Sequence, residues 1–531
     1  MAGVVLYDTT LRDGAQQEGI SLSVEDKLKV ARKVDELGVQ YIEGGFPGAN
    51  PKDDEFFRQA RGLRLQHATL VAFGSTRRAG GRAETDPTLL ALLSAETPTI
   101  TLVGKSWDLH VTQVLETTLE ENLAMIADSI RFLKGQGREV FFDAEHFFDG
   151  FRANPQYALQ ALRAAQEAGA DCLVLCDTNG GALPHQVAET VLLVRQQVRV
   201  PLGIHAHNDA DTAVANSLAA IQAGVTQVQG TVNGYGERCG NANLLSIIAD
   251  LQLKMGIPCI TPEQLASLTE VSRYVGEVVN IPPNTVQPYV GVNAFTHKAG
   301  LHASAVAKVE QSYQHIQPQV VGNATQVLVS ELAGRGNVAF KLREMGLAGQ
   351  APPAVVRRLV EVVKERESLG FQYEVADASF ELLARRLIPG YKPPFELVDY
   401  LVVVEKRRRA VGDAEGDGVL AEATVKVRLG SRVAHVAGEG NGPVNALDAA
   451  LRQALRELYP QVERVKLVDY KVRVVNPDGA TGAVVRVLIE CTDGESVWHT
   501  VGASSNIIEA SWMALADSLE WWLVRRGSGT I

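Results

Sequence analysis

The segment Asp8-Thr-Thr-Leu-Arg-Asp-Gly-Ala-Gln16 follows directly on the apolar run Val4–Tyr7. The run predicts a buried strand, and the segment places two carboxylates and a guanidinium where that strand ends. Burying such charges is costly unless they pair or bind a metal. Taken alone, the segment has two interpretations: a solvated loop with a surface ion pair between Arg12 and Asp13, or part of a functional site.

The alternation of a short apolar run with a helical pattern recurs through the first half of the chain. The helical pattern Val24–Leu37 ends at Gly38, as helices commonly do, and Gly169 and Gly224 also close helical patterns just before an apolar run. Eight strands, each followed by a helix, over roughly 250 residues predict an α/β fold, the (β/α)₈ TIM barrel. The predicted strands are Val4–Tyr7, Val39–Glu43, Ala68–Phe73, Thr99–Val103, Val140–Ala144, Cys172–Cys176, Leu202–Ala206 and Thr226–Gln229.

A doubly wound open sheet is the alternative fold. That fold normally carries a glycine-rich phosphate-binding turn after its first strand. The first turn here, Thr9-Thr-Leu-Arg-Asp-Gly14, lacks that pattern, so the barrel is favoured.

The alternation of predicted strands and helices ends at about residue 261. Residues 261–394 predict helical linker subdomains, closed by the hinge Lys392-Pro-Pro394. From residue 395 the chain is β-rich and contains an internal repeat: Asn445-Ala-Leu-Asp-Ala-Ala450 and Asn506-Ile-Ile-Glu-Ala-Ser511 each head a helix after two strand-like runs. We therefore expect a catalytic TIM barrel over 1–260, helical linker subdomains over 261–394, and a C-terminal α+β regulatory domain of two pseudo-repeated units over 395–531.

The composition excludes several classes of protein. The chain of 531 residues is too long for one hydrophobic core, so several domains are expected. Its net charge of −11 argues against nucleic-acid binding, which needs a basic surface. The basic run Lys406-Arg-Arg-Arg409 is short and reads as a solvated linker face. No apolar run reaches membrane-spanning length, and no export signal is expected at the N-terminus. Five scattered cysteines without a C-x-x-C pair suit reduced thiols, so we expect a cytoplasmic location.

Polar residues gather at the predicted carboxyl ends of the strands, where the active site of a TIM barrel lies. The strand interiors read as apolar. The polar residues at the strand ends are Arg12, Asp13, Glu43, Asp143, Glu145, His146, Asp177, Thr178, Asn179, His205, His207, Asn208, Asp209, Asn233, Glu237, Arg238 and Asn241.

His205-Ala-His207 indicates a metal site. Strand side chains alternate between faces, so histidines at i and i+2 point the same way. Paired imidazoles with a nearby carboxylate suit a divalent metal, and the competing interpretation is a pair of packed histidines. Asp13 is the natural third ligand and Asn241 an oxygen donor. Asp209 and Asp211 are alternative ligands, and Cys239 is a further option, although a small loop filler suits it better.

Three of these motifs together resemble the DRE-TIM metallolyase superfamily. They are the opening segment, His205-Ala-His207 and Gly236-Glu-Arg-Cys-Gly-Asn241. Over essentially the whole chain, the sequence looks like the group of 2-isopropylmalate, homocitrate and citramalate synthases. Three further stretches look most like the pyruvate-using citramalate branch of that group: Glu43–Asp54, Asp143–Gly150 and Val501–Trp512.

The resemblance implies roles for individual residues. Asp13, His205, His207 and Asn241 would hold a divalent metal, for which Mg²⁺, Mn²⁺ or Zn²⁺ are all suitable. Arg12 would lie beside the keto oxygen of a 2-oxoacid, and Thr178 would hold its carboxylate. Glu145 would lie near the methyl group of acetyl-CoA. His302 and Tyr313 match positions thought to assist proton transfer. Asp8 and Thr10 are left as support for the site.

The implied activity is a Claisen-type condensation of acetyl-CoA with pyruvate that gives (R)-citramalate and CoA, on a route to isoleucine. The nearest alternative is the 2-isopropylmalate synthase reaction on 2-oxoisovalerate, on the leucine route, followed by homocitrate synthesis. A metal-dependent hydrolase or a non-catalytic sensor are further alternatives. The resemblance also implies a homodimer and an amino-acid effector at the C-terminal domain, with Gly438–Gly442 as a candidate effector loop.

Overall fold

The computed structural model describes residues 3–306, 308–406 and 419–526. It divides into two compact units: residues 1–295 with 316–324, and residues 296–315 with 325–531. Residues 407–409 of the basic run lie outside the described residues. No helix within the described ranges is both long and apolar enough to cross a membrane.

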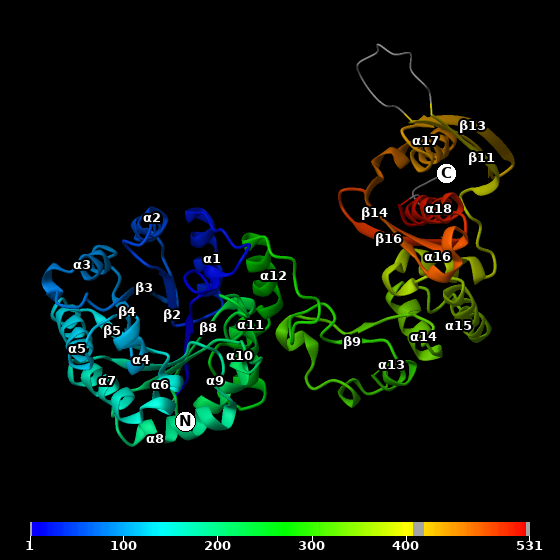
Figure 1. The fold of residues 1–531 in the computed structure, drawn as a ribbon. Helices are drawn as coiled ribbons and strands as arrows, with labels where there is room; N and C mark the ends of the chain where they lie inside the picture. The colour runs from blue at the N-terminus through cyan, green and yellow to red at the C-terminus, as the bar shows by residue number, and fades with distance from the viewer. Residues whose placement is uncertain (1–2, 307, 407–418, 527–531) are drawn as a thin grey trace, which may run out of the picture. The chain divides into compact units, whose positions relative to one another are not determined.

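The first unit is a closed barrel of eight parallel strands in the order β1 to β8, as the sequence predicts. Helices surround the strands (Figure 1). The strands are β1 Val5–Asp8, β2 Tyr41–Gly45, β3 Thr69–Ser75, β4 Thr99–Lys105, β5 Glu139–Glu145, β6 Cys172–Asp177, β7 Leu202–Ala206 and β8 Gln227–Gly230. The ring closes where β1 pairs with β8, for example at Tyr7 and Gln229.

The surrounding helices are α1 Val24–Glu36, α2 Pro51–Ala60, α3 Pro87–Ser94, α4 Asp108–Gln113, α5 Leu119–Gly135, α6 Phe147–Ala153, α7 Pro155–Glu167, α8 Pro184–Arg195, α9 Ala213–Gln222, α10 Leu244–Leu253, α11 Pro262–Leu265 and α12 Leu268–Val279. Gly38 and Gly169 follow α1 and α7 with φ of 92° and 99°, a backbone conformation that glycine adopts without strain. Helix α12 packs on α1, and its Val271 and Val275 join the barrel core.

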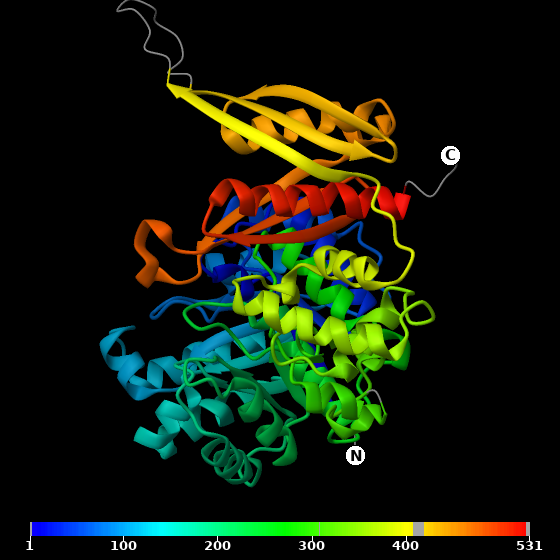
Figure 2. The ribbon, with the colours of Figure 1, turned by 90° about the vertical axis from the view of Figure 1, so that its right-hand side faces the viewer.

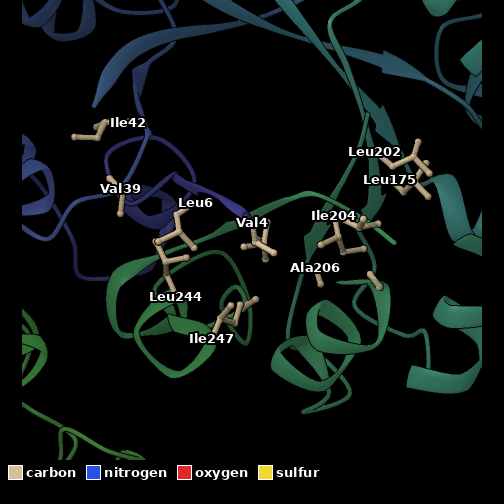
Figure 3. Packing of buried hydrophobic residues seen from close by; sticks show 14 of the residues in the cluster. Val4, Leu6, Val39, Ile42, Leu175, Leu202, Ile204, Ala206, Leu244 and Ile247 are labelled. Atoms are coloured by element: carbon tan, nitrogen blue, oxygen red, sulfur yellow. The ribbon is translucent and has the colours of Figure 1, made fainter. Parts of the chain in front are cut away.

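The outer layer of the barrel is apolar because helices cover it. Ile204 and Ala206 on β7 and Leu6 on β1 belong to this layer, where Leu6 lies beside Leu244 of α10 (Figure 3). Because side chains alternate along a strand, the residues between them face the barrel interior. His205 and Tyr7 are such residues, and both are buried.

The second unit begins with short elements and a helical part. These are β9 Thr296–His297, α13 Gly300–Val306, β10 Gln326–Val327, α14 Arg335–Glu344, α15 Pro353–Ser368 and α16 Asp377–Leu387. Val501 and Ala503, much later in the chain, share a hydrophobic core with these helices. Arg386 of α16 also pairs with Glu520 at 2.6 Å. The predicted boundary at residue 394 therefore separates two parts that share a hydrophobic core. The predicted boundary at residue 260 likewise precedes α12, whose residues join the barrel core.

The C-terminal part of the second unit contains two copies of a repeat, each made of three strands and a helix (Figure 2). The first is β11 Glu396–Lys406, β12 Val419–Leu429, β13 Arg432–Gly440 and α17 Pro443–Arg456; the second is β14 Lys466–Val474, β15 Val485–Thr492, β16 Val497–Ser504 and α18 Ile507–Arg526. The predicted pair of repeats is present, but each repeat has one strand more than the sequence patterns indicated. The additional strands, β11 and β14, are edge strands with exposed apolar residues, so they lack the alternation typical of a half-buried strand.

Candidate active site at the barrel mouth

Asp13, His205 and His207 form a buried cluster suited to a metal ion. One ligand atom from each residue lies within 4.8 Å of the others. The Nε2 atoms of the two histidines are 3.3 Å apart, and they lie 3.4 and 3.9 Å from Oδ2 of Asp13. Asp209 and Asp211, the alternative ligands, do not belong to this cluster.

Asn241 completes the cluster. Its Nδ2 donates to Oδ1 of Asp13 at 3.1 Å and to the carbonyl of Tyr235 at 3.2 Å. Its Oδ1 is buried and has no hydrogen-bond partner among the described residues. A buried acceptor without a donor is costly, and a cation would satisfy it. The donor set of two imidazoles, a carboxylate and an amide oxygen therefore fits a divalent metal.

The electrostatics of the cluster also favour a cation. Burial alone would raise the pKa of Asp13, but Arg12 and His205 bring it well below the usual range. Burial, followed by the neighbouring His205, lowers the pKa of His207 to about 3. Asp13 is therefore a carboxylate and His207 a neutral imidazole at neutral pH, which are the protonation states that metal ligands require. Burial opposes protonation of His205, but the hydrogen bond and charge of Asp13 raise its pKa, so a metal would displace a proton from this ring.

Arg12 joins Asp13 to a second buried carboxylate, Glu43 of β2. The guanidinium donates from Nη1 to Asp13 at 2.8 Å and from Nε to Glu43 at 2.7 Å. It stacks over the ring of Phe73, 3.8 Å from the centroid. Tyr7 and Thr9 also donate to Glu43. The ion pair of the solvated-loop interpretation does form, but its side chains are only 14% and 5% exposed at the barrel mouth, which contradicts a solvated surface loop.

Thr178 follows β6 with its hydroxyl held by the backbone. The N–H of His146 donates to its Oγ1 at 2.8 Å. Among the described residues, no acceptor takes the hydroxyl proton of Thr178, so this proton can be donated to an acceptor such as a substrate carboxylate. Arg238 donates to the carbonyl of Thr178 at 2.7 Å and pairs with Asp209, which explains why Asp209 is not part of the metal cluster.

Glu145 ends β5 and pairs with Lys105 at the end of β4. Strands β4 and β5 are neighbours, and these two residues are in register. The apolar run predicts a strand that ends at Val103, two residues before Lys105, so Lys105 is not among the predicted site residues. Its position could have indicated a role in the site, because Lys105 is a charged residue at the carboxyl end of a strand.

His302 and Tyr313 belong to the second compact unit. Both are exposed, and their rings stack with centroids 4.2 Å apart. The structure therefore brings these two residues together, and their role in proton transfer stays a prediction. Cys239 is also exposed, and it lines a cavity of about 950 Å³ with Asn241 and Asn208.

The expectation that strand interiors are apolar is wrong. The barrel interior holds a set of buried polar side chains below the cluster: Tyr7, Thr99, Thr101, Asp143, Gln227 and Gln229. The outer face of each strand carries the apolar residues that pack on helices, so short apolar runs concealed the polar residues between them. Burial, with help from Glu43, raises the pKa of Asp143 to about 7.

Comparison with known proteins shows the family to which the chain belongs. The family model described as HMGL-like matches residues 3–275. The models described as homocitrate synthase post-HMGL domain-like and LeuA allosteric (dimerisation) domain match residues 289–368 and 374–523. An (R)-citramalate synthase of Geobacter sulfurreducens is 51% identical over 98% of both chains. The chain belongs to the citramalate synthase family.

Other members of the citramalate synthase family are equally similar. The (R)-citramalate synthase of Streptomyces coelicolor is 53% identical over 98% of this chain and 97% of its own. A probable 2-isopropylmalate synthase of Methanopyrus kandleri is 35% identical over 96% of both chains. The predicted membership of the DRE-TIM group, in its citramalate branch, is confirmed.

Proposed function

We propose that the chain condenses acetyl-CoA with pyruvate and water to give (R)-citramalate and CoA. The observation that carries this proposal is the buried set of Asp13, His205, His207 and Asn241 with the guanidinium of Arg12 beside it. That set occurs in a chain about half identical to (R)-citramalate synthases over nearly its whole length.

The reaction needs an electrophilic ketone and a carbanion equivalent from the acetyl methyl group. A divalent cation in the cluster would polarise the ketone oxygen as a Lewis acid. Arg12 has no hydrogen-bond partner for Nη2 within the described part of the chain, so that group can donate to the oxygen on which negative charge develops. Thr178 can donate its free hydroxyl proton to the carboxylate of the 2-oxoacid.

The methyl proton must pass to a base before the carbon–carbon bond forms. Glu145 is the candidate from the barrel, and its pairing with Lys105 holds it in place. His302 and Tyr313 are the candidates from the second unit. The carbanion then adds to the ketone carbon, and water cleaves the thioester to release CoA.

Product analysis tests the proposal. The full chain is incubated with a divalent metal, pyruvate and acetyl-CoA labelled with ¹³C in the acetyl group. We expect one molecule of labelled citramalate for each CoA released, observed by NMR. Release of labelled acetate instead, at a rate independent of the 2-oxoacid, would overturn the proposal in favour of thioester hydrolysis.

The second candidate is the 2-isopropylmalate synthase reaction, in which 2-oxoisovalerate replaces pyruvate. The similarity to a probable 2-isopropylmalate synthase favours keeping it, although that identity is 35% rather than about half. The two reactions share the chemistry of the cluster and differ only in the size of the 2-oxoacid. Their relative rates therefore decide between them.

We also propose that isoleucine inhibits the enzyme through the C-terminal domain. A cavity of about 370 Å³ lies between β14 and the start of α17, lined by Asn441, Asn445, Asp448 and Tyr470. One carboxylate oxygen of Asp448, Oδ1, is buried without a partner among the described residues, so it can accept from an ammonium group. Leu467 and Leu515 supply apolar lining for an aliphatic side chain.

Substitution within the cavity tests this regulation better than removal of the domain. Deleting the residues after Lys392 would expose the core that α16 shares with Val501 and Ala503. Asp448→Asn is expected to raise the isoleucine concentration for half-inhibition at least about 10-fold, because it removes one charge-assisted hydrogen bond. Activity without isoleucine should not change. Asp469→Asn, an exposed carboxylate paired with Lys471, is the control, and equal inhibition of all three proteins would contradict this site.

We further propose a homodimer in the cytoplasm. The match to a domain described as LeuA allosteric (dimerisation) supports the dimer. The five cysteines are free thiols in the structure, which suits a reducing compartment.

A further inference from the structure

Gln229 lies directly behind the metal cluster. It sits on β8 in register with His205 on β7, and its side chain is completely buried in the barrel interior. Its Oε1 is 2.8 Å from Nδ1 of His205, the ring nitrogen that faces away from the cluster. Its Nε2 donates to Oδ1 of Asp143 on β5 at 3.3 Å.

The orientation of this amide determines which nitrogen of His205 carries a proton. An amide has one accepting end and one donating end, and Oδ1 of Asp143 accepts from the donating end. The NH₂ group therefore faces Asp143, and Oε1 faces His205. Nδ1 of His205 must then donate, so in the neutral ring the lone pair lies on Nε2, which faces Asp13 and His207. The reversed amide would place its oxygen against a carboxyl group and would put a proton on Nε2, where a metal must bind.

His207 provides an internal comparison. Its Nδ1 is buried and has no hydrogen-bond partner among the described residues. No neighbour therefore fixes its tautomer in the way that Gln229 fixes that of His205. The support is specific to one ligand.

We propose that Gln229, oriented by Asp143, is a positioning residue that holds His205 in the tautomer that binds metal. The inference rests on the proposed metal site and deepens it. Outer partners of histidine ligands fix the ring and raise its basicity, and their loss typically lowers metal affinity about 10- to 100-fold.

The test measures metal binding without catalysis. Isothermal titration with Mn²⁺ gives the dissociation constant of the full chain, and circular dichroism checks the fold. Gln229→Met has nearly the volume of glutamine but neither hydrogen bond, and we expect it to raise the dissociation constant about 10- to 100-fold. Gln227→Met is the matched control, since Gln227 is buried two residues earlier on the same strand, and its Oε1 has no partner among the described residues. It should bind Mn²⁺ as the unaltered chain does.

A second variant distinguishes positioning from packing and serves if Gln229→Met fails to fold. The pair Gln229→Glu with Asp143→Asn exchanges the carboxylate and the amide, so residue 229 still accepts from His205 and residue 143 now donates. We expect Mn²⁺ affinity within about 10-fold of the unaltered chain. Equal affinity in Gln229→Met, or loss of affinity in the exchanged pair, would overturn the inference. Absence of Mn²⁺ binding by the unaltered chain would overturn the metal site itself.

Discussion

Asp8 and Asp13 show how different two buried carboxyls five residues apart can be. Asp13 faces His205, His207 and Arg12, which keep it ionised. Asp8 accepts from the N–H and the hydroxyl of Thr10, and burial raises its pKa to about 7. The first is equipped to bind a cation, and the second supports the turn that carries Asp13.

Asp13→Asn tests this contrast. The change removes the charge of a metal ligand, so we expect Mn²⁺ affinity and kcat/KM to fall more than about 100-fold, beyond the loss typical of an outer partner. Asp8→Asn is the control. It should stay within about 10-fold, because Asp8 lies outside the metal cluster and burial raises its pKa to about 7, so that about half of its charge is already absent near pH 7. Titration calorimetry and the rate of CoA release provide the two readouts, and an Asp13→Asn protein with full affinity would refute the cluster.

Sequence predicted the residues of the cluster because they follow a rule of position. His205 and His207 share a strand face, and Asp13 follows another strand of the same barrel. Lys105 follows the same rule of position, at the carboxyl end of β4, but Gln229 could not be predicted in this way. A glutamine within an apolar strand has no pattern of its own, and its role depends on a neighbour that only the closed barrel supplies.

Among the elements, α1 and α2 are joined by a buried ion pair. Lys27 pairs with Asp53 and donates to the carbonyl of Gly44 at 3.0 Å. Asp53 also accepts from the N–H of Phe46 at 3.0 Å. This pair holds the start of α2 against the mouth of the barrel, beside Glu43.

Lys27→Met should destabilise the barrel, because it leaves the carboxylate of Asp53 buried without its cation. Such a change costs about 3–5 kcal/mol. For a unit of this size, that lowers the melting temperature of the barrel transition by roughly 6–20 °C in calorimetry. Lys29→Met, on the same helix with an exposed partner in Glu25, should leave the melting temperature nearly unchanged, because an exposed ion pair contributes little to stability. Equal melting temperatures for the two variants would contradict a stabilising role of the pair.

The two additional strands of the C-terminal repeats had an identifiable signal. Leu397-Val-Asp-Tyr400 and Leu467-Val-Asp-Tyr470 are the same tetrapeptide, at the start of β11 and of β14. Both strands shift register at the same point of that tetrapeptide. The repeat is therefore longer than the helix starts indicated, and comparison of the tetrapeptides would have revealed it.

At the scale of the whole molecule, β11 leaves apolar side chains uncovered. Leu401 is 61% exposed and Val403 is 53% exposed, on an edge strand. Exposed apolar edges commonly mark surfaces that a partner covers. In the proposed homodimer, a second copy of the chain would cover this strand.

Sedimentation tests the dimer. We expect a species of about twice the 57.2 kDa of one chain. Leu401→Arg should raise the dissociation constant of the dimer at least about 10-fold, because it places a charge in an apolar interface. Leu192→Arg, on an exposed part of α8, is the control. A dimer unaffected by Leu401→Arg but dissociated by Leu192→Arg would place the interface on the barrel instead.

The most direct test of the central claim is the preference of the full chain among 2-oxoacids. CoA release from acetyl-CoA is measured with pyruvate, 2-oxoisovalerate and 2-oxoglutarate at saturating divalent metal. Each additional methyl group in a fitted pocket changes kcat/KM by about 10- to 200-fold. We therefore predict that kcat/KM for pyruvate exceeds that for either other acid by at least about 10-fold. A preference for 2-oxoisovalerate, or CoA release that needs no 2-oxoacid, would contradict citramalate synthesis by this chain.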